Sequence, residues 1–268
     1  MSLAFDHLVH FLRRSPLEAA EEMRRMGFHA VAGGRHEGWG TYNSLCYFDV
    51  SYVEFLAVEH SETAERSENP LIQQLVRDLP QSGEGLGQIA LRTREIERLA
   101  EHLKQNGLNV IGPVPGSRQR VDGSIIRWSM LFAKSDDVQH PLPFFIQWEQ
   151  SDEERRMDLT SRDVIAAHPN GARRIDRIAW AVADLEDTAE RWQEWFGLCA
   201  GDLYEDQRLQ ARCRLLHCPG GNILLCSPHG QGVTAEALAK RGERPFLVRL
   251  AGASCSGEAT VFGSKYQW

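Results

Sequence analysis

One pattern occurs three times in the 268 residues and limits the folds open to the chain. Each copy begins with a short apolar strand and continues through a polar break into an amphipathic helix that ends at a glycine. The spacing from strand to glycine is nearly constant: 20 residues from His7 to Gly27, 19 from Gln88 to Gly107, and 20 from Arg177 to Gly197. Such agreement indicates one structural module repeated three times.

Residues typical of helix ends flank the three expected helices. We expect the helices at residues 16–26, 94–105 and 185–195. Each is preceded by a residue able to cap the first turn, namely Ser15, Thr93 and Asp184. The glycine after each helix supplies the left-handed conformation that helix C-termini prefer.

Three strand-like stretches follow each glycine, so the module is βαβββ. They are residues 28–32, 44–49 and 51–58, then 108–111, 124–133 and 144–149, then 199–203, 211–217 and 222–227. One such unit cannot bury both faces of its sheet, so units must pair. We predict an α+β fold in which two paired βαβββ modules form a cupped mixed sheet and a third module is added.

The charged segment 151–156 is typical of a boundary between two parts. Residues 1–150 are expected to be the paired modules that form the cup. Residues 151–268 are expected to be the third module, with an extra strand at 245–251 that resembles a lone strand of an incomplete fourth unit.

Composition excludes several classes of protein. With 42% hydrophobic residues the chain can bury a core. Its 30 basic and 37 acidic residues are interspersed, which argues against nucleic acid as a partner. No apolar run approaches the roughly 20 residues that span a bilayer, and the N-terminus has no signal-like segment. We therefore expect a cytoplasmic protein that is not bound to membranes.

Glu54 and His7 are the candidate catalytic residues. Glu54 is the only charged residue in the apolar stretch 51–57, and an unpaired buried carboxylate is costly. It therefore needs a partner or a solvated cavity. His7 lies on the first strand of the same module; the alternative for it is a histidine hydrogen-bonded within a sheet.

The other modules offer weaker chemistry at the corresponding positions. The second module has Gln88 on its first strand and Gln147 on its last, if Gln147 is aligned with Glu54. The third has only Arg177. The site is therefore expected in the first pair of modules, with Gln147 as a polar contact to substrate.

Two segments are expected to line the cup. The glycine-rich loop at 33–43 offers His36, Trp39, Thr41 and Asn43, but lacks the glycine order of a phosphate-binding loop. Arg118, Arg120 and Trp128 flank a hairpin-like turn at 121–124. We take Arg120 as a contact to a carboxylate or phosphate and Trp128 as an apolar wall; the alternative is a solvated hairpin with one buried tryptophan.

The repeat, with Asp6-His7 on the first strand and Glu54 on the fourth, resembles the vicinal-oxygen-chelate superfamily of glyoxalases, extradiol dioxygenases and bleomycin-resistance proteins. Further stretches resemble its glyoxalase-like domain branch: residues 33–43 followed by 52–56, then 142–148 and 168–172. The resemblance implies a divalent ion (Zn, Ni, Mn or Fe) held by His7, Glu54 and Gln88, with Gln147 or His36 as further candidates.

Two hypotheses for function follow. The first is a metal-assisted lyase, isomerase or dioxygenase acting on a small vicinally oxygenated molecule. The second is a metal-free protein that binds or sequesters a small molecule, as the antibiotic-resistance members of the superfamily do. A third, separate hypothesis is that the last module provides an assembly surface, with a homodimer as the expected assembly.

Overall fold

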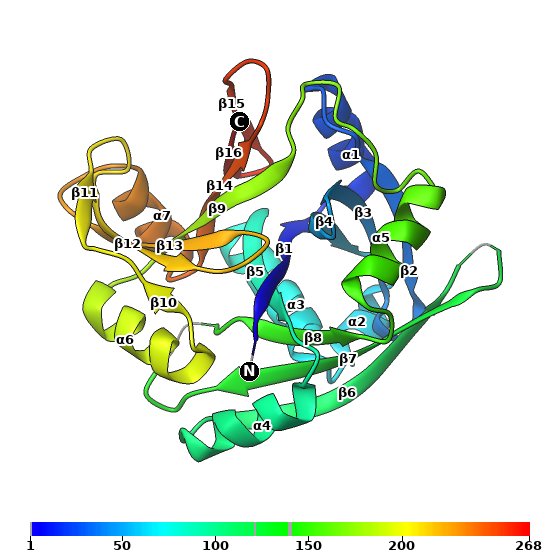
Figure 1. Cartoon of the computed structure of the whole chain (residues 1–268), viewed down its shortest axis with the longest axis horizontal. Helices are drawn as coiled ribbons and strands as arrows, with labels where there is room; N and C mark the ends of the chain where they lie inside the picture. The colour runs from blue at the N-terminus through cyan, green and yellow to red at the C-terminus, as the bar shows by residue number, and fades with distance from the viewer. Residues whose placement is uncertain (1, 121, 139–140) are drawn as a thin grey trace.

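Two mixed β-sheets make up the protein (Figure 1). The computed structural model describes residues 2–120, 122–138 and 141–268. In spatial order the first sheet contains β2 (Val31–His36), β3 (Thr41–Phe48), β4 (Ser51–Val58), β1 (Ala4–Leu12), β5 (Gly85–Arg92), β8 (Phe144–Trp148), β7 (Ile125–Lys134) and β6 (Asn109–Gln119). The second contains β10 (Cys199–Ala200), β12 (Ala211–His217), β13 (Asn222–Pro228), β9 (Arg174–Ala181), β14 (Pro245–Ala251), β16 (Ser264–Gln267) and β15 (Glu258–Val261), and β11 (Tyr204–Asp206) pairs with β12.

The two modules of the first sheet join through their first strands. β1 runs antiparallel to β5, while β4 lies parallel to β1 and β8 lies parallel to β5. This arrangement makes one continuous curved sheet from two βαβββ units. The predicted α+β fold of paired modules is thereby confirmed.

The second sheet repeats the same plan. β13 lies parallel to β9, β14 runs antiparallel to β9, and β16 lies parallel to β14. The stretch 245–251 is therefore not a lone strand, because β15 and β16 continue its unit. This fourth unit lacks the helix that the other three have between first and second strands.

The helices of the three full modules begin and end close to where their sequences indicate. They are α1 (Pro16–Arg25), α4 (Ile96–Gln105) and α6 (Leu185–Phe196). Ser15 forms a capping box with Glu18, and Asp184 accepts a hydrogen bond from the backbone N–H of Asp187. Thr93 does not cap α4, because that helix begins at Ile96.

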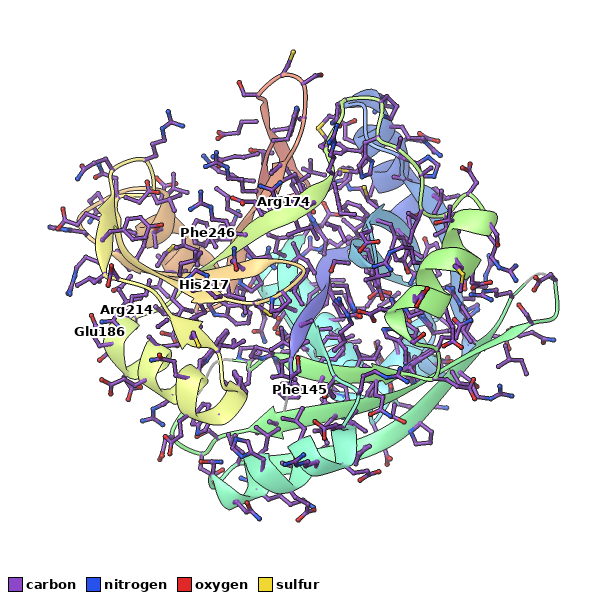
Figure 2. The ribbon with its side chains drawn as sticks, in the orientation of Figure 1. Phe145, Arg174, Glu186, Arg214, His217 and Phe246 are labelled. Carbon is purple, nitrogen blue, oxygen red and sulfur yellow. The ribbon has the colours of Figure 1, made fainter. Side chains whose placement is uncertain are left out.

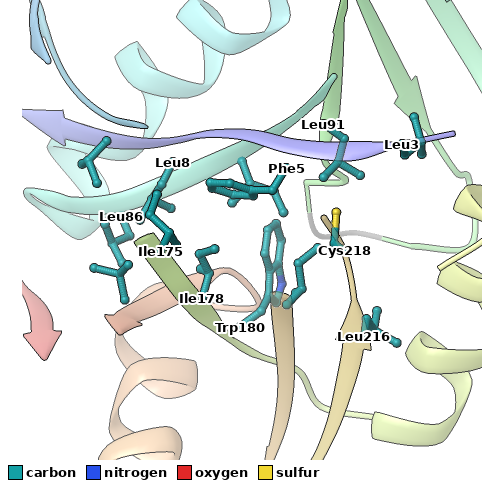
Figure 3. Close-up of a cluster of buried hydrophobic side chains, with 14 of the residues drawn as sticks. Leu3, Phe5, Leu8, Leu86, Leu91, Ile175, Ile178, Trp180, Leu216 and Cys218 are labelled. Carbon is teal, nitrogen blue, oxygen red and sulfur yellow. The ribbon is translucent and has the colours of Figure 1, made fainter. Parts of the chain in front are cut away.

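The main core lies between the two sheets. Phe5 and Leu8 of β1 face Ile178 and Trp180 of β9, and all four are fully buried (Figure 3). Helix α6 ties the second sheet to the first, since the rings of Phe145 and Phe196 are 5.4 Å apart; Figure 2 marks the place of Phe145 on β8. At least these faces of both sheets are therefore unavailable to ligands.

The opposite faces of the two sheets differ. In the second sheet, α7 (Val233–Arg241) covers the face formed by Ala179 and Cys226. In the first sheet, α3 (Pro70–Ser82) covers only part of the face, where Leu75 packs near Phe11. The rest of the concave face of the first sheet remains open.

Several elements were not predicted. Helices α2 (Ser61–Glu65) and α3 connect the first two modules. The charged segment expected as a plain boundary begins α5 (Asp152–Ser161), with a capping box between Ser151 and Glu154. α5 lies beside the first sheet in Figure 1. Among the described residues, no helix is long and apolar enough to cross a membrane.

Candidate functional site

A cavity of about 960 Å³ occupies the open concave face of the first sheet. The strands β1, β3, β4, β7 and β8 supply its floor and sides. Leu71 and Ile72 of α3 close one side, and Arg155 and Leu159 of α5 close another. Two of the helices that were not predicted from the sequence, α3 and α5, thus enclose the cavity.

A β-bulge at Asp6 creates the central contact of the site. Opposite β5, Phe5 pairs with Leu91 and His7 pairs with Ala90, so Asp6 is one extra residue on β1. A bulge interrupts the alternation of side chains between the two faces. As a result, the side chains of the neighbours Asp6 and His7 meet, with Oδ1 of Asp6 2.7 Å from Nδ1 of His7.

Asp6 is fully buried and held by three groups. Besides His7, Nε1 of Trp148 donates to Oδ2 of Asp6 at 2.9 Å, and Nη1 of Arg155 lies 3.3 Å from the same oxygen. Arg155 also lies 4.3 Å above the Trp148 ring. Burial alone would raise the pKa of Asp6, but Arg155 and His7 lower it to about 2. Asp6 is therefore a fixed anion.

This anion sets the orientation of His7. A carboxylate can only accept a hydrogen bond, so Nδ1 of His7 carries the proton that bonds to Asp6. The ring stacks on Tyr52 at 4.6 Å, and Nε2 lies 3.6 Å from Oε2 of Glu54. Both His7 and Glu54 line the cavity.

Glu54 is oriented by an amide that is itself fixed. Nδ2 of Asn43 donates to Oε1 of Glu54 at 2.5 Å, while Oδ1 of Asn43 accepts from the backbone N–H of Gly34 at 2.8 Å. A Cβ at Gly33 would overlap the Asn43 side chain. Gly33 is thus required by the close approach of Asn43.

The segment expected as a glycine-rich loop is mostly strand. Residues 31–36 form β2, and the 3-10 helix η1 (Glu37–Trp39) follows. Nδ1 of His36 lies 3.2 Å from Oγ1 of Thr41, and burial lowers the pKa of His36 to about 4. His36 and Trp39 line the cavity, whereas Thr41 lies behind His36.

The hairpin of β6 and β7 forms the far wall of the cavity. Trp128 and Arg120 both line it, as predicted from the sequence, but Arg120 is paired with Asp158 of α5 at 2.5 Å. Arg118 also lines the cavity and has no such partner among the described residues. Val121, part of the predicted turn, lies outside the described residues.

Neither glutamine of the second module lines the cavity. The amide of Gln88 donates to the carbonyl of Leu142 and its oxygen accepts from the backbone N–H of Ile89. Gln147 points to the opposite face, where its oxygen accepts from the backbone N–H of Ile96 at the start of α4. Successive side chains of a strand point to opposite faces, so Gln147 faces away from the cavity while its neighbours Ile146 and Trp148 line it.

The donor set does not fit the divalent ion that the superfamily resemblance implies. Protein sites for such ions offer at least three donors from the protein. Here His7 and Glu54 converge, but Gln88 and Gln147 are engaged elsewhere, and Oε1 of Glu54 is taken by Asn43. Within the described ranges there is no group of three or more His, Cys, Asp or Glu residues that could hold an ion.

Several residues of this site were not predicted as site residues from the sequence. A signal existed for Asp6, which is a lone acid in an apolar strand just as Glu54 is. None existed for Arg155, whose segment is uniformly charged. Tyr47, Tyr52 and Trp148 are aromatic residues on strands, and nothing separates them from core residues before the faces of the strands are known.

Paired βαβββ modules around a cupped sheet define a vicinal-oxygen-chelate fold. The family model described as "Glyoxalase-like domain" matches residues 5–196. The chain belongs to this glyoxalase-like domain family, and the predicted family is confirmed. Among curated proteins, none matches the chain.

Solved structures share the fold over nearly the whole chain. A hypothetical protein from Staphylococcus aureus has a TM-score of 0.77 at 21% identity, covering 99% of this chain and 98% of that one. A mutant 4-hydroxymandelate synthase from Streptomyces coelicolor has a TM-score of 0.62 at 11% identity, covering 93% and 71%. A xylose isomerase-like TIM barrel/4-hydroxyphenylpyruvate dioxygenase fusion protein has a TM-score of 0.54 at 14% identity, covering 92% of this chain and 36% of that one. At these identities the likeness shows the fold alone.

Proposed function

We propose that the protein is an enzyme that transfers a proton on a small oxygenated molecule bound in the cup, by a lyase or isomerase reaction that uses His7 and Glu54 without a metal ion. The observation that carries the proposal is the line of groups from Asp6 through His7 to Glu54. Nδ1 of His7 is 2.7 Å from Asp6, and Nε2 is 3.6 Å from Glu54.

The geometry supports a division of roles. Because Nδ1 holds its proton toward Asp6, Nε2 is free to accept a proton from a carbon or oxygen of the substrate. The Asp6 carboxylate then stabilises the imidazolium that forms. Glu54, oriented by Asn43 and with Oε2 3.6 Å from Nε2 of His7, would take this proton from the imidazolium and give it to a neighbouring atom of the substrate, so that both residues regain their starting protonation states.

The metal-assisted hypothesis has less support, because only two of its expected ligands converge. A dioxygenase reaction would also require a redox metal, for which this donor set is unsuited. Elemental analysis of protein purified without chelator tests the point. Stoichiometric metal in the native protein, lost in a His7→Ala/Glu54→Ala double variant, would overturn the metal-free mechanism.

Proton transfer can be tested before the substrate is known. Small 2-oxo and 2-hydroxy carboxylic acids would be incubated with the protein in D₂O, and deuterium incorporation next to the oxygenated carbon followed by NMR. We expect exchange with at least one compound and its loss in His7→Gln and in Glu54→Gln. The matched control is His217→Gln on β12, an exposed histidine remote from the cup (Figure 2). Exchange that persists in both variants, or no exchange with any compound, would contradict the proposal.

A binding protein without turnover is the second candidate. The aromatic lining, in which the rings of Trp39 and Trp128 are 6.1 Å apart, favours it. Ligand binding that is unaffected by His7→Gln, in the absence of any exchange, would support this candidate over the enzyme.

A further inference from the structure

Five arginines line the cavity, and four of them are neutralised by carboxylates. The pairs are Arg35 with Glu59 at 2.7 Å, Arg120 with Asp158 at 2.5 Å, Arg155 with Asp6 at 3.3 Å, and Arg162 with Asp122 at 2.5 Å. The fifth is Arg118, which is half-buried and has no carboxylate partner among the described residues. A guanidinium in such a setting lacks the anion that its fork of donors fits.

The side chain of Arg118 packs closely against Gly34. A Cβ added at Gly34 would lie 2.5 Å from Nη1 of Arg118 and 2.9 Å from both Cδ and Cζ. The guanidinium therefore lies directly against the Gly34 backbone, in space that only glycine leaves free.

The guanidinium of Arg118 lowers the pKa values of two residues that line the cavity. Its positive charge adds to burial in lowering the pKa of His36, and Glu54 opposes both. It also lowers the pKa of Tyr47, which burial raises to about 12. His36 and Tyr47 both line the cavity, so the guanidinium lies within electrostatic reach of two of its walls.

Aromatic rings lie near the guanidinium of Arg118. Arg118 on β6 pairs with Ile126 on β7, and Trp128 lies two residues further along the same face. The ring of Trp128 is 6.1 Å from that of Trp39 and 6.4 Å from that of His36. The rings of Trp39, Trp128 and His36 thus lie close together near the guanidinium of Arg118.

We propose that the substrate of the cup is a small carboxylate monoanion with a flat ring, whose carboxylate binds Arg118 and whose ring packs against Trp39 and Trp128. This deepens the proposed function and rests on it for the reactive end, which would face His7 and Glu54. Among the described residues Arg118 is the one lining arginine without a carboxylate partner, and a single such cation favours one negative charge over the higher charge of a phosphate, because Glu54 already contributes a negative charge to the cavity.

The test is equilibrium binding, followed by tryptophan fluorescence and calorimetry. The probes are phenylacetate, its neutral analogue phenylacetamide, acetate without a ring, and phenyl phosphate. We expect phenylacetate to bind most tightly. Arg118→Gln should weaken it by about tenfold or more, which is the cost of losing a charge-assisted hydrogen bond. The matched control is Arg127→Gln, an exposed arginine on the same hairpin whose partner is Glu149.

Three results would overturn the inference: phenylacetamide binding as tightly as phenylacetate, unchanged affinity in Arg118→Gln, or no binding of phenylacetate. Tighter binding of phenyl phosphate would overturn the choice of a monoanion. A His7→Gln/Glu54→Gln variant separates these outcomes from those of the proposed function, because it removes the two proton-transfer groups and keeps Arg118. If phenylacetate binds through Arg118 but no compound exchanges deuterium, the proton-transfer proposal fails and the anion subsite stands.

Discussion

Nδ1 of His10 lies 2.8 Å from the hydroxyl of Tyr266, which joins the first strand of one sheet to the last strand of the other. Nε2 of His10 donates to the backbone carbonyl of Phe262 at 3.0 Å, so Nδ1 accepts the hydroxyl proton. Both side chains are fully buried. The fourth, incomplete unit is therefore attached to the first module by a polar contact as well as by apolar packing.

Tyr266→Phe should destabilise the protein by about 1–3 kcal/mol, because it leaves Nδ1 of His10 buried without a partner. The free energy of unfolding in urea measures the effect. Tyr204→Phe removes a hydroxyl from a residue that is 38% exposed and should cost less than about 0.5 kcal/mol. Equal effects of the two substitutions would mean that the His10 contact contributes nothing.

Acid should destabilise the protein between pH 6.5 and about 4. Burial lowers the pKa of His10 to about 4, with Arg241 adding to this effect and Phe262 and Glu84 opposing it. The unfolded chain therefore binds this proton at higher pH than the folded chain, and stability falls as the pH drops through the window. In His10→Asn the loss of stability over this window should shrink by up to about 3 kcal/mol. An identical pH profile would contradict the assignment.

Arg155→Met should cost about 3–5 kcal/mol, because it leaves the Asp6 carboxylate buried without its cation. Its neighbour provides the control: Arg156 pairs with Asp49 at the exposed surface, and Arg156→Met should cost less than about 1 kcal/mol. Urea denaturation measures both. Similar values for the two variants would show that Asp6 does not depend on Arg155.

Gly34→Ala should weaken phenylacetate binding by displacing Arg118, with little change in stability because the displaced atoms belong to a flexible side chain. Gly38→Ala is the matched control, since a Cβ at Gly38 meets nothing within 4 Å. Calorimetric titration and thermal unfolding separate the two effects. Unchanged affinity in Gly34→Ala would mean that the position of Arg118 against Gly34 is irrelevant to binding.

Asp158→Asn should open the cavity. Asp158 on α5 binds Arg120 at 2.5 Å and Arg162 at 2.8 Å, and Arg162 also binds Asp122 near the hairpin tip. Removing this charge should increase the quenching of cavity tryptophans by acrylamide. High salt should do the same to the wild-type protein, since it screens exposed pairs. Asp187→Asn, which breaks an exposed pair within α6, should have no such effect.

The repeat could be predicted because its signals are local. Apolar periodicity, a capping residue and a terminal glycine all lie within one module, and Gly27, Gly107 and Gly197 do adopt positive φ angles of 80°, 78° and 66°. Thr93 does not cap α4 because the helix begins three residues later, at Ile96, whose backbone N–H donates to Gln147, a residue 51 positions away. A hydrogen-bond partner so far away in the sequence cannot be predicted from a local pattern of residues.

The site could be predicted only in part, for the same reason. His7 and Glu54 were singled out as polar residues in apolar strands, and the structure brings them together at 3.6 Å. Gln147 was wrongly expected in the cavity, because a shift of one residue along a strand moves a side chain to the other face of the sheet. α5 was missed because its one buried side chain is Arg155, so it shows no apolar stripe.

The bulge at Asp6 makes the length of β1 part of the chemistry. In a regular strand without the bulge, the side chains of Asp6 and His7 would point to opposite faces and could not meet, although both residues would still be present in the sequence. An insertion or deletion in this strand should therefore disrupt the contact between Asp6 and His7 as a substitution at His7 would. A related protein that has both Asp6 and His7 but lacks the bulge would therefore have the residues of the site without their geometry.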